Sequence, residues 1–295
     1  MSPPKSKVLV ELPRYGLGNK FLIWAKAYVF AQQHGFELFV KNWVHVPVGT
    51  FIRKEKSKRW YGGYFVLKNH WINTLRFWFF KYFYRITLEP TNKVIESKKV
   101  LYLFKNVPSH LDYFAQLKAH RGHIIQAFHQ LIRPHIHQLV ATQPKPFIGV
   151  HIRRSDFPAQ DCIPLNEFMA QITALRGVLD AEVPVTIFTD AHQTQIAPIL
   201  AMPACRLSEN LPDIADLLLL SQSKILITSY NSTFSYWAAF ISDAIIIRNE
   251  RDNLGQIRPK ELTDVVYEGK LSQEGTRPKP LLANLLELKK NLRGS

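Results

Sequence analysis

The sequence predicts an α/β protein built of two units, and three observations lead to this prediction. In the second half of the chain, apolar strand-like runs alternate with helix-like segments, which is typical of a parallel sheet covered by helices on both faces. The beginning of the chain indicates a βαβ motif. Charge is divided unevenly, because residues 1–143 contain 22 Lys and Arg against 6 Asp and Glu, whereas residues 144–295 contain 16 against 17. We therefore expect one domain over 1–143 and a second over 144–295.

The first unit begins as a strand, a helix and a second strand. Its expected elements are a strand at 7–12, a glycine-rich turn at 13–19, a helix at 21–34, strands at 37–40 and 101–104, and a helical stretch at 111–140. Gly35 directly follows the helical apolar spacing as a stop signal. Two prolines, Pro144 and Pro146, mark the junction that we take as the boundary between the units.

The second unit has the regular alternation of a parallel sheet. Its expected strands lie at 147–152, 185–189, 225–228 and 244–247, and its expected helices lie near 164–178, 191–201, 211–223 and 233–241. Ligands of such sheets bind at the carboxyl ends of the strands. Polar residues of three predicted strand ends, Asp156, Asp190 and the Tyr230–Ser235 segment, fall at that edge.

Composition narrows the class of protein. A chain of 295 residues with 46% hydrophobic content is sufficient for one large domain or two ordinary ones. Cys162 and Cys205 form neither a disulfide framework nor a metal-binding spacing, so we expect a reducing, cytoplasmic compartment. Residues 1–7 lack an apolar core, so no signal peptide is expected. No apolar run reaches the length of a membrane span.

A buried strand is expected to end in His151, Arg153 and Arg154, with Asp156 close behind. Guanidinium groups stay charged and match the oxygens of a phosphate. At the end of a parallel strand, we interpret this pair of arginines as a clamp for a diphosphate. The alternative is an inter-domain salt bridge from Arg153 or Arg154 to an acid.

The strand expected at 225–228 is followed by hydroxyl-bearing residues and then by a helix. Ser232 or Thr233 would cap this helix. The N–H groups and the positive dipole end of a helix also form an anion site, so either a plain cap or a ligand site fits.

Asp213 and Asp216 precede a run of four leucines. They are candidates for helix capping, and a carboxylate here could instead accept hydrogen bonds from a guanine edge.

Two further features carry weaker information. Gly16, Gly18 and Asn19 resemble half of a dinucleotide fingerprint without its third glycine, which indicates either a tight turn or a backbone that lets a sugar or phosphate approach. The eleven histidines form no HExxH motif, and the sequence has no acid pair of the DxD type. We therefore expect no metal site.

The segment 53–85 contains nine basic residues against a single acid, Glu55, with aromatic residues interleaved. It could lie on an anionic membrane surface, bind nucleic acid by stacking and phosphate contacts, or be a helical insert with its aromatic residues in the core. A place in the core is the usual one for aromatic residues, but the basic content strengthens the case for an anionic surface, and of the two anionic partners we rank membrane contact above nucleic acid.

These motifs together resemble the α1,2/α1,6/protein O-fucosyltransferase superfamily, most closely the bacterial α1,2-fucosyltransferase group. Residues 16–21 (GLGNKF) resemble its GxLGNQxF element, 151–157 (HIRRSDF) its HxRRGDY motif, 188–190 (FTD) its (S/T)D element, 216–222 (DLLLLSQ) the segment before its last strand, and 231–239 (NSTFSYWAA) its NSTFSWWAA motif. Departures from the motifs include Lys20 in place of a glutamine, Ser155 in place of a glycine, Tyr236 in place of a tryptophan, and Ala191 where the α1,6 branch has a second Asp.

The resemblance implies a GT-B architecture of two Rossmann-like domains with a cleft between them, GDP-fucose on the C-terminal half and the acceptor on the N-terminal half. It implies an inverting reaction that needs no metal or other cofactor. Carried over by position, the donor-binding residues are His151, Arg153, Arg154, Asp190, Asp216, Asn231, Ser232, Thr233 and Phe234, with Gly16, Gly18 and Asn19 at the N-terminal motif.

The resemblance also assigns individual roles. Arg153 would hold the β-phosphate, while His151 and Asp216 would recognise guanine. An acid ten residues after the motif histidine is the proposed base of the α1,6 branch, and Asp161 occupies that position here. Asp156 would orient the loop.

We therefore expect a cytoplasmic glycosyltransferase, peripheral at the membrane if 53–85 contacts it, that transfers fucose from GDP-fucose to a hydroxyl of a glycan or lipid-linked glycan. One alternative is a GT-B glycosyltransferase with another GDP- or nucleotide-sugar donor. Another is a non-catalytic protein that binds sugar or nucleic acid; a nucleic-acid partner would leave the motifs of the neutral half without a purpose.

Overall fold

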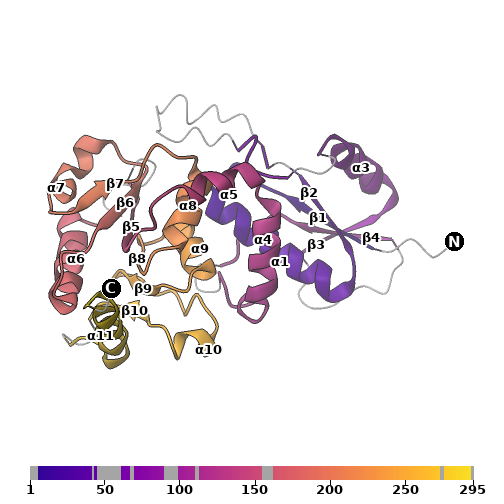
Figure 1. Ribbon diagram of the computed structural model, residues 1–295. Coiled ribbons are helices and arrows are strands. Elements are labelled where there is room, and N and C mark those ends of the chain that lie inside the picture. The colour runs from indigo at the N-terminus through magenta and orange to yellow at the C-terminus, as the bar shows by residue number, and fades with distance from the viewer. Residues whose placement is uncertain are drawn as a thin grey trace. The chain divides into compact units, whose positions relative to one another are not determined.

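The computed structural model describes residues 6–41, 43–44, 61–66, 70–89, 99–109, 113–154, 162–272 and 276–293. These residues form two compact units, the first ending at Pro134 and the second beginning at His135 (Figure 1). The sequence predicts the boundary after residue 143. The difference is one short helix, α5 (Pro134–Ala141), whose packing groups most of it with the second unit.

The first unit is a parallel sheet with helices. Its elements are β1 (Lys7–Glu11), α1 (Leu17–His34), β2 (Glu37–Lys41), α3 (His70–Phe83), β3 (Arg85–Leu88), β4 (Val100–Phe104), the 3₁₀ turn η2 (Lys118–His120) and α4 (Arg121–Leu131). The sheet has four parallel strands in the order β2-β1-β4-β3. The central strands are apolar because they are covered on both faces.

Helix α1 packs against β1, β2 and β4 of this sheet. It ends as predicted, because Gly35 adopts the left-handed conformation with φ 61° and its N–H group bonds back to Ala31 and Gln32. It begins earlier than predicted, at Leu17. Gly18 and Asn19 therefore belong to the first helical turn and not to a preceding loop.

The second unit is a larger parallel sheet with helices. After α5 its elements are β5 (Ile148–Ile152), α6 (Leu165–Leu179), β6 (Val185–Thr189), η4 (Gln193–Ile196), α7 (Ala197–Leu200), β7 (Cys205–Leu207), α8 (Asp213–Ser221), β8 (Ile225–Ile227), α9 (Thr233–Ile241), β9 (Ile245–Arg248), α10 (Lys260–Thr263), β10 (Glu268–Lys270) and α11 (Lys279–Arg293). The six strands are parallel in the order β10-β9-β8-β5-β6-β7. The prediction of an α/β fold with parallel sheets is confirmed.

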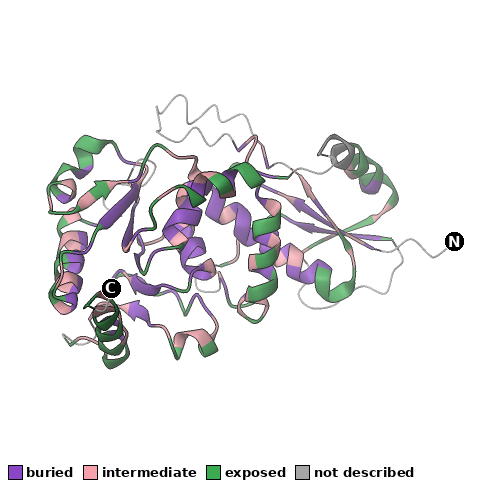
Figure 2. Ribbon diagram, viewed as in Figure 1, coloured by how far each residue is buried: buried purple, intermediate pink, exposed green. Residues whose placement is uncertain are grey.

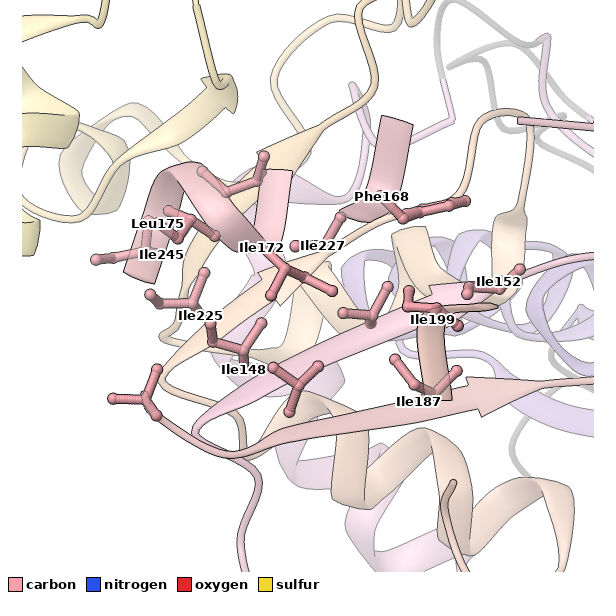
Figure 3. Close-up of a cluster of buried hydrophobic side chains, with 14 of the residues drawn as sticks. Ile148, Ile152, Phe168, Ile172, Leu175, Ile187, Ile199, Ile225, Ile227 and Ile245 are labelled. Atoms are coloured by element: carbon pink, nitrogen blue, oxygen red, sulfur yellow. The ribbon is translucent and has the colours of Figure 1, made fainter. Parts of the chain in front are cut away.

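The core of the second unit is rich in isoleucine. β5, β6 and β8 are buried along nearly their whole length (Figure 2). Figure 3 shows Ile172 and Leu175 of α6 beside Ile148, Ile225 and Ile245 of the strands. The strands are apolar on both sides because helices cover both faces.

One glycine lets a helix approach the central strand. A Cβ at Gly149 would lie 2.9 Å from Leu220 Cδ1 of α8 and closer still to the hydroxyl of Ser223. The absence of a side chain at this position of β5 therefore sets how closely α8 packs on the sheet.

A buried ion pair fastens the last strand of the sheet. Arg258 and Glu268 are both inaccessible to solvent and lie 3.2 Å apart between Nε and Oε2. The guanidinium also donates hydrogen bonds to the carbonyls of Ser242, Ala244 and Tyr267. Because each charge is paired and the remaining donors have acceptors, the group is tolerated in the core.

Three strands and one helix break differ from the predicted elements. β3, β7 and β10 have three or four residues each and were not expected. The helical stretch predicted at 111–140 is divided into α4 and α5, with Ile132 in extended conformation and Pro134 opening the second helix. Among the described residues, no helix combines the length and the apolar character required to cross a bilayer.

Candidate functional site

The predicted polar residues of the second unit lie along one edge of its sheet. Strand pairing places Leu207, Ile187, Val150 and Ile227 in one row across β7, β6, β5 and β8. All four strands run in the same direction, so the residues that follow this row lie at the carboxyl ends of the strands. We call this region the carboxyl edge, and it is where parallel sheets bind their ligands.

His151 is a buried and uncharged base at the carboxyl edge. Its side chain stacks on Phe234, with ring centroids 5.0 Å apart and an interplanar angle of 27°. Burial lowers the pKa of His151 to about 4; the charge of Asp190 opposes this shift and that of Arg153 adds to it. At neutral pH the imidazole is therefore uncharged. Its Nδ1 is buried without a hydrogen-bond partner.

The two arginines after β5 are held by their backbone. The N–H of Arg153 donates to Ser229 Oγ at 3.3 Å, and the N–H of Arg154 donates to Asp190 Oδ1 at 2.7 Å. The side chain of Arg154 donates through Nη2 to the carbonyl of Ile163 at 2.9 Å, while its buried Nε has no partner. The Arg154 side chain thus holds the backbone at Ile163, and the Asp190 carboxylate holds the backbone of Arg154.

The turn between β8 and α9 is fixed by hydrogen bonds of its own. Asn231 adopts the left-handed conformation with φ 55°, which asparagine tolerates better than most residues. Its N–H donates to the hydroxyl of Tyr236 at 2.9 Å. Ser235 Oγ accepts from the N–H of Ser229 at 3.2 Å and donates to the carbonyl of Ser232 at 3.1 Å.

Tyr236 is one of the departures from the motif, and its hydroxyl has a role that a tryptophan could not fill in the same way. Burial and then the neighbouring Asp252 carboxylate raise the pKa of Tyr236 far above its ordinary value. The phenol is therefore neutral, and it holds the Asn231 turn from inside the core.

Ser232 is the N-cap residue of α9, but its hydroxyl makes no capping hydrogen bond. The prediction that Ser232 caps the helix is therefore wrong, and Thr233 does not cap it either because it is already the first helical residue. Ser232 is fully buried, and its Oγ has no hydrogen-bond partner. A buried hydroxyl without a partner is unfavourable unless a ligand or water satisfies it.

Asp216 lies farther along the same edge. It is in the first turn of α8, whose N-cap is Pro212, so it does not cap the helix with its side chain. Its Oδ1 accepts a hydrogen bond of 2.6 Å from the hydroxyl of Ser208, the residue after β7. Neighbouring strands lie about 4.8 Å apart. Three such spacings separate the end of β8 from the end of β7, a span that suits an extended ligand.

The remaining predicted residues lie elsewhere. Gly16 is the N-cap residue of α1 in the first unit, with φ −63°, and a Cβ there would meet nothing within 4 Å; Gly18 and Asn19 follow it in the helix. Asp156 and Asp161, the candidate loop acid and base, lie outside the described residues. Among the described residues, no group of three or more His, Cys, Asp or Glu side chains could hold a metal ion.

Two residues of the carboxyl edge, Ser208 and Ser229, were not singled out from the sequence, and for a third, Tyr236, the contact that it makes was not predicted. Ser208 holds Asp216, Ser229 holds the backbone of Arg153, and Tyr236 holds Asn231. Ser229 and Tyr236 stand inside the NSTFSYWAA region or directly before it, so proximity to the motif was a usable indication. Ser208 follows β7, a strand too short to be predicted, and gave no sequence signal.

The carboxyl edge therefore combines the parts of an anion site. It offers two guanidinium groups, the N-terminus of α9, and buried polar atoms of His151 and Ser232 that lack protein partners. The first-turn N–H groups of a helix have no acceptor within the helix and attract phosphate. This arrangement suits a phosphorylated ligand with an aromatic base.

Comparisons with known proteins establish the fold. No protein-family model matches the sequence, and no curated protein matches it. The structure of NodZ α1,6-fucosyltransferase co-crystallised with GDP has a TM-score of 0.55 and 15% identity, and the match covers 85% of this chain and 97% of that one. For NodZ soaked with GDP-fucose the TM-score is 0.55 and the identity 16%, and the match covers 85% of this chain and 98% of that one. For fucosyltransferase NodZ from Bradyrhizobium the TM-score is 0.55 and the identity 15%, with 83% and 96% of the two chains covered. The chain thus has the fold of a GT-B glycosyltransferase.

Proposed function

We propose that this protein is a GDP-fucose-dependent glycosyltransferase that transfers fucose to a hydroxyl of a glycan acceptor with inversion, without a metal ion. The finer expectation is α1,2-like transfer. Two findings support the proposal: structures with the same fold were determined with GDP and with GDP-fucose, and the described parts of the four motif segments in the second unit meet at the carboxyl edge of its sheet.

The observation that carries the proposal is the set of buried polar atoms without protein partners at this edge. Ser232 Oγ, His151 Nδ1 and Arg154 Nε are side-chain atoms of this kind, and they come from the residues that the resemblance assigns to the donor. Leaving such groups unsatisfied costs about 1–3 kcal/mol each. A nucleotide that supplies their partners would remove this cost.

Arg153 and the N-terminus of α9 would stabilise the leaving group. When the acceptor oxygen attacks the anomeric carbon, the bond to the β-phosphate oxygen breaks and negative charge collects on GDP. A guanidinium group and oriented N–H groups stabilise that charge in the transition state. Asp190 and Ser229 accept hydrogen bonds from the backbone N–H groups of both arginines, so the backbone that carries the two cations is fixed before the ligand arrives.

The acceptor hydroxyl must lose a proton as its oxygen forms the new glycosidic bond. A carboxylate can take this proton, and we assign the role to Asp161, with Asp156 as an orienting acid. Both assignments are made from sequence position.

The base of the nucleotide would be read by neutral groups and an oriented carboxylate. The imidazole of His151 is uncharged near neutral pH and stacked on Phe234. Asp216, held by Ser208, presents the type of acceptor that pairs with the N–H groups of guanine. Adenine and uracil do not offer the same pair of donors.

Calorimetric titration of the protein with GDP, UDP and ADP tests the donor class. We expect GDP to bind at least tenfold more tightly than the other two, because the Asp216 carboxylate matches a pair of N–H donors that only guanine offers. An Asp216→Asn variant should lose this preference, while Asp213→Asn serves as its matched control in the same helical turn. Equal affinity for the three nucleotides would contradict the proposal.

Release of GDP from GDP-fucose in the presence of water alone tests activity without a known acceptor. Comparison with a GDP-hexose donor separates fucose from other sugars. A protein that binds GDP but releases none from any GDP-sugar, with or without oligosaccharide acceptors, would be a non-catalytic binding protein.

A further inference from the structure

Helix α3 of the first unit exposes an unusual group of apolar side chains. Leu75, Trp78, Phe79, Tyr82 and Phe83 are 71%, 48%, 55%, 78% and 61% exposed, and the described part of the helix is largely exposed in Figure 2. We call these five residues the α3 face. Of the twelve large exposed hydrophobic residues in the described chain, seven lie within 75–88. Single exposed apolar residues are ordinary, whereas a cluster marks an interaction site.

The α3 face is not needed to attach the helix to its sheet. Phe80 is buried, and its ring lies 5.4 Å from that of Phe39 on β2. Phe77 and Tyr84 are partly buried against the same core cluster. At about 100° per residue these three positions share one side of the helix, and the α3 face occupies roughly 140° of the opposite side.

Cationic side chains border the α3 face. Residues 70–88 contain three basic residues and no acid. Helical spacing places Arg76 at one border and Lys81 at the other, and Arg85 follows the helix. Lys81 Nζ lies 5.1 Å from the ring centroid of Trp78. Arg76 is 3.7 Å from Glu37, so part of its charge is offset.

An anionic lipid surface matches both features. Helices that lie in a membrane interface bury apolar and aromatic side chains at the boundary of headgroups and acyl chains, and neighbouring Lys and Arg side chains reach the lipid phosphates. Single-stranded nucleic acid instead requires a cationic groove along its backbone with aromatic residues between the cations. A second copy of the chain would bring like charges together.

We propose that the α3 face docks the protein on the surface of an anionic bilayer, with Trp78, Phe79 and Phe83 at the headgroup level and Lys81 and Arg85 at the phosphates. This surface belongs to the first unit and does not depend on the proposed nucleotide site. Docking would place the enzyme where a lipid-linked acceptor is found.

Flotation of the full-length protein with lipid vesicles tests the proposal. Vesicles of phosphatidylcholine and phosphatidylglycerol at about three to one should bind the protein at least tenfold more strongly than phosphatidylcholine alone, and binding should weaken as salt rises. Intrinsic tryptophan fluorescence should shift to shorter wavelength on binding. No binding to the anionic vesicles would overturn the proposal.

Two variants locate the contact. The triple variant Trp78→Ser/Phe79→Ser/Phe83→Ser should reduce binding at least tenfold, and Lys81→Glu/Arg85→Glu about fivefold or more for each reversed charge. The matched control Val265→Ser/Leu282→Ser/Leu286→Ser replaces exposed apolar residues of the second unit and should bind as the wild type does. If the triple variant loses its thermal unfolding transition, the charge variant decides.

Other partners give distinct results. Binding to a fluorescent oligonucleotide that the triple variant loses, without binding to vesicles, would show a nucleic-acid surface. A wild-type dimer in sedimentation that becomes a monomer in the triple variant, again without vesicle binding, would show self-association. Either result, or unchanged vesicle binding by both variants, overturns the proposal.

Discussion

Each unit has a turn from a strand into a helix that resembles a fucosyltransferase motif, and the two turns differ in what their buried polar groups contact. At the start of α1, the ammonium of Lys20 is buried, donates to the carbonyl of Trp43 at 3.0 Å and lies 4.8 Å from the ring centroid of Tyr61. At the start of α9, the hydroxyl of Ser232 is equally buried and has no partner.

This difference distinguishes a buried polar side chain that stabilises the fold from one that is available to a ligand. Lys20 stands where the motif has a glutamine, and its bond to the Trp43 carbonyl ties α1 to the chain that follows β2. A buried polar group with a partner stabilises the fold, whereas one without a partner is retained only if something else satisfies it. We therefore expect substitution of Ser232 to change ligand binding, and substitution of Lys20 to change stability.

The largest effect is expected from Arg153→Ala. If the guanidinium stabilises the departing diphosphate, its removal should lower the rate of GDP release from GDP-fucose by about 10³-fold. Arg206→Ala removes the same charge from an exposed position on β7, two strands away from β5 in the sheet, and should leave the rate within about twofold. Equal activity of the two variants would contradict the clamp.

The second effect concerns acid stability of the second unit. The folded-state pKa of His151 is about 4, below the ordinary value of 6.5. Between these values the unfolded chain binds more protons, so stability falls as pH falls. We expect this group to cost roughly 2 to 3 kcal/mol of stability between pH 7.5 and 4.5. Denaturant unfolding of wild type and His151→Gln should differ in pH slope, and parallel slopes would refute the assignment.

The third effect concerns the alkaline stability of the first unit, which should also rise as pH rises. Burial lowers the pKa of Lys20 to about 7 from 10.5. The unfolded chain therefore binds more protons between pH 7 and 10.5, and stability should rise with pH, by about 2 kcal/mol from pH 7 to 9. Lys20→Met should lack this rise. Its affinity for GDP, measured by calorimetry, should remain that of the wild type.

The fourth effect compares two serines three positions apart. Ser235 bonds within the turn, so Ser235→Ala should lower the free energy of unfolding by about 1–2 kcal/mol. Ser232→Ala should leave the unliganded protein as stable or more stable, because it removes an unsatisfied hydroxyl. Ser232→Ala should instead weaken GDP binding about tenfold. Thermal melts with and without GDP distinguish the two cases; a destabilised unliganded Ser232→Ala would count against the site.

The smallest effect is expected at Gly16. Its φ of −63° is open to any residue, and a Cβ would meet nothing within 4 Å. Gly16→Ala should change the unfolding free energy by less than about 0.5 kcal/mol. Any large loss of transfer activity in a normally stable Gly16→Ala protein would show that a substrate approaches this backbone, and would make the α1 turn a functional site as well.

The sequence predicted those elements whose own residues determine them. β5, β6, β8 and β9 are apolar runs, and α6 and α9 begin or end within a residue of the expected positions. β3, β7 and β10 were missed because they are short strands at the edges of their sheets, of which Cys205-Arg206-Leu207 is an example. Such strands form because a neighbouring strand offers unpaired backbone groups, and that information lies elsewhere in the chain.

The candidate site was predicted in its location more than in its internal contacts. The alternation of strands and helices placed His151, Arg153, Asp190 and Ser232 at one edge, and strand pairing confirms this. The sequence could not show that Ser232 leaves its helix uncapped, because the choice between capping and ligand binding depends on side-chain direction. It also could not show that Ser208 holds Asp216, since the two meet only when β7 joins the sheet.

The buried pair of Arg258 and Glu268 has a consequence for shortening the chain. Arg258 donates to the carbonyls of Ser242 and Ala244 just beyond the end of α9, and Glu268 accepts from the backbone N–H groups of Ile257 and Arg258. A fragment that stops before β10 would leave a guanidinium ion in the protein interior with no counterion. Excised versions of the second unit should therefore retain residues through at least β10.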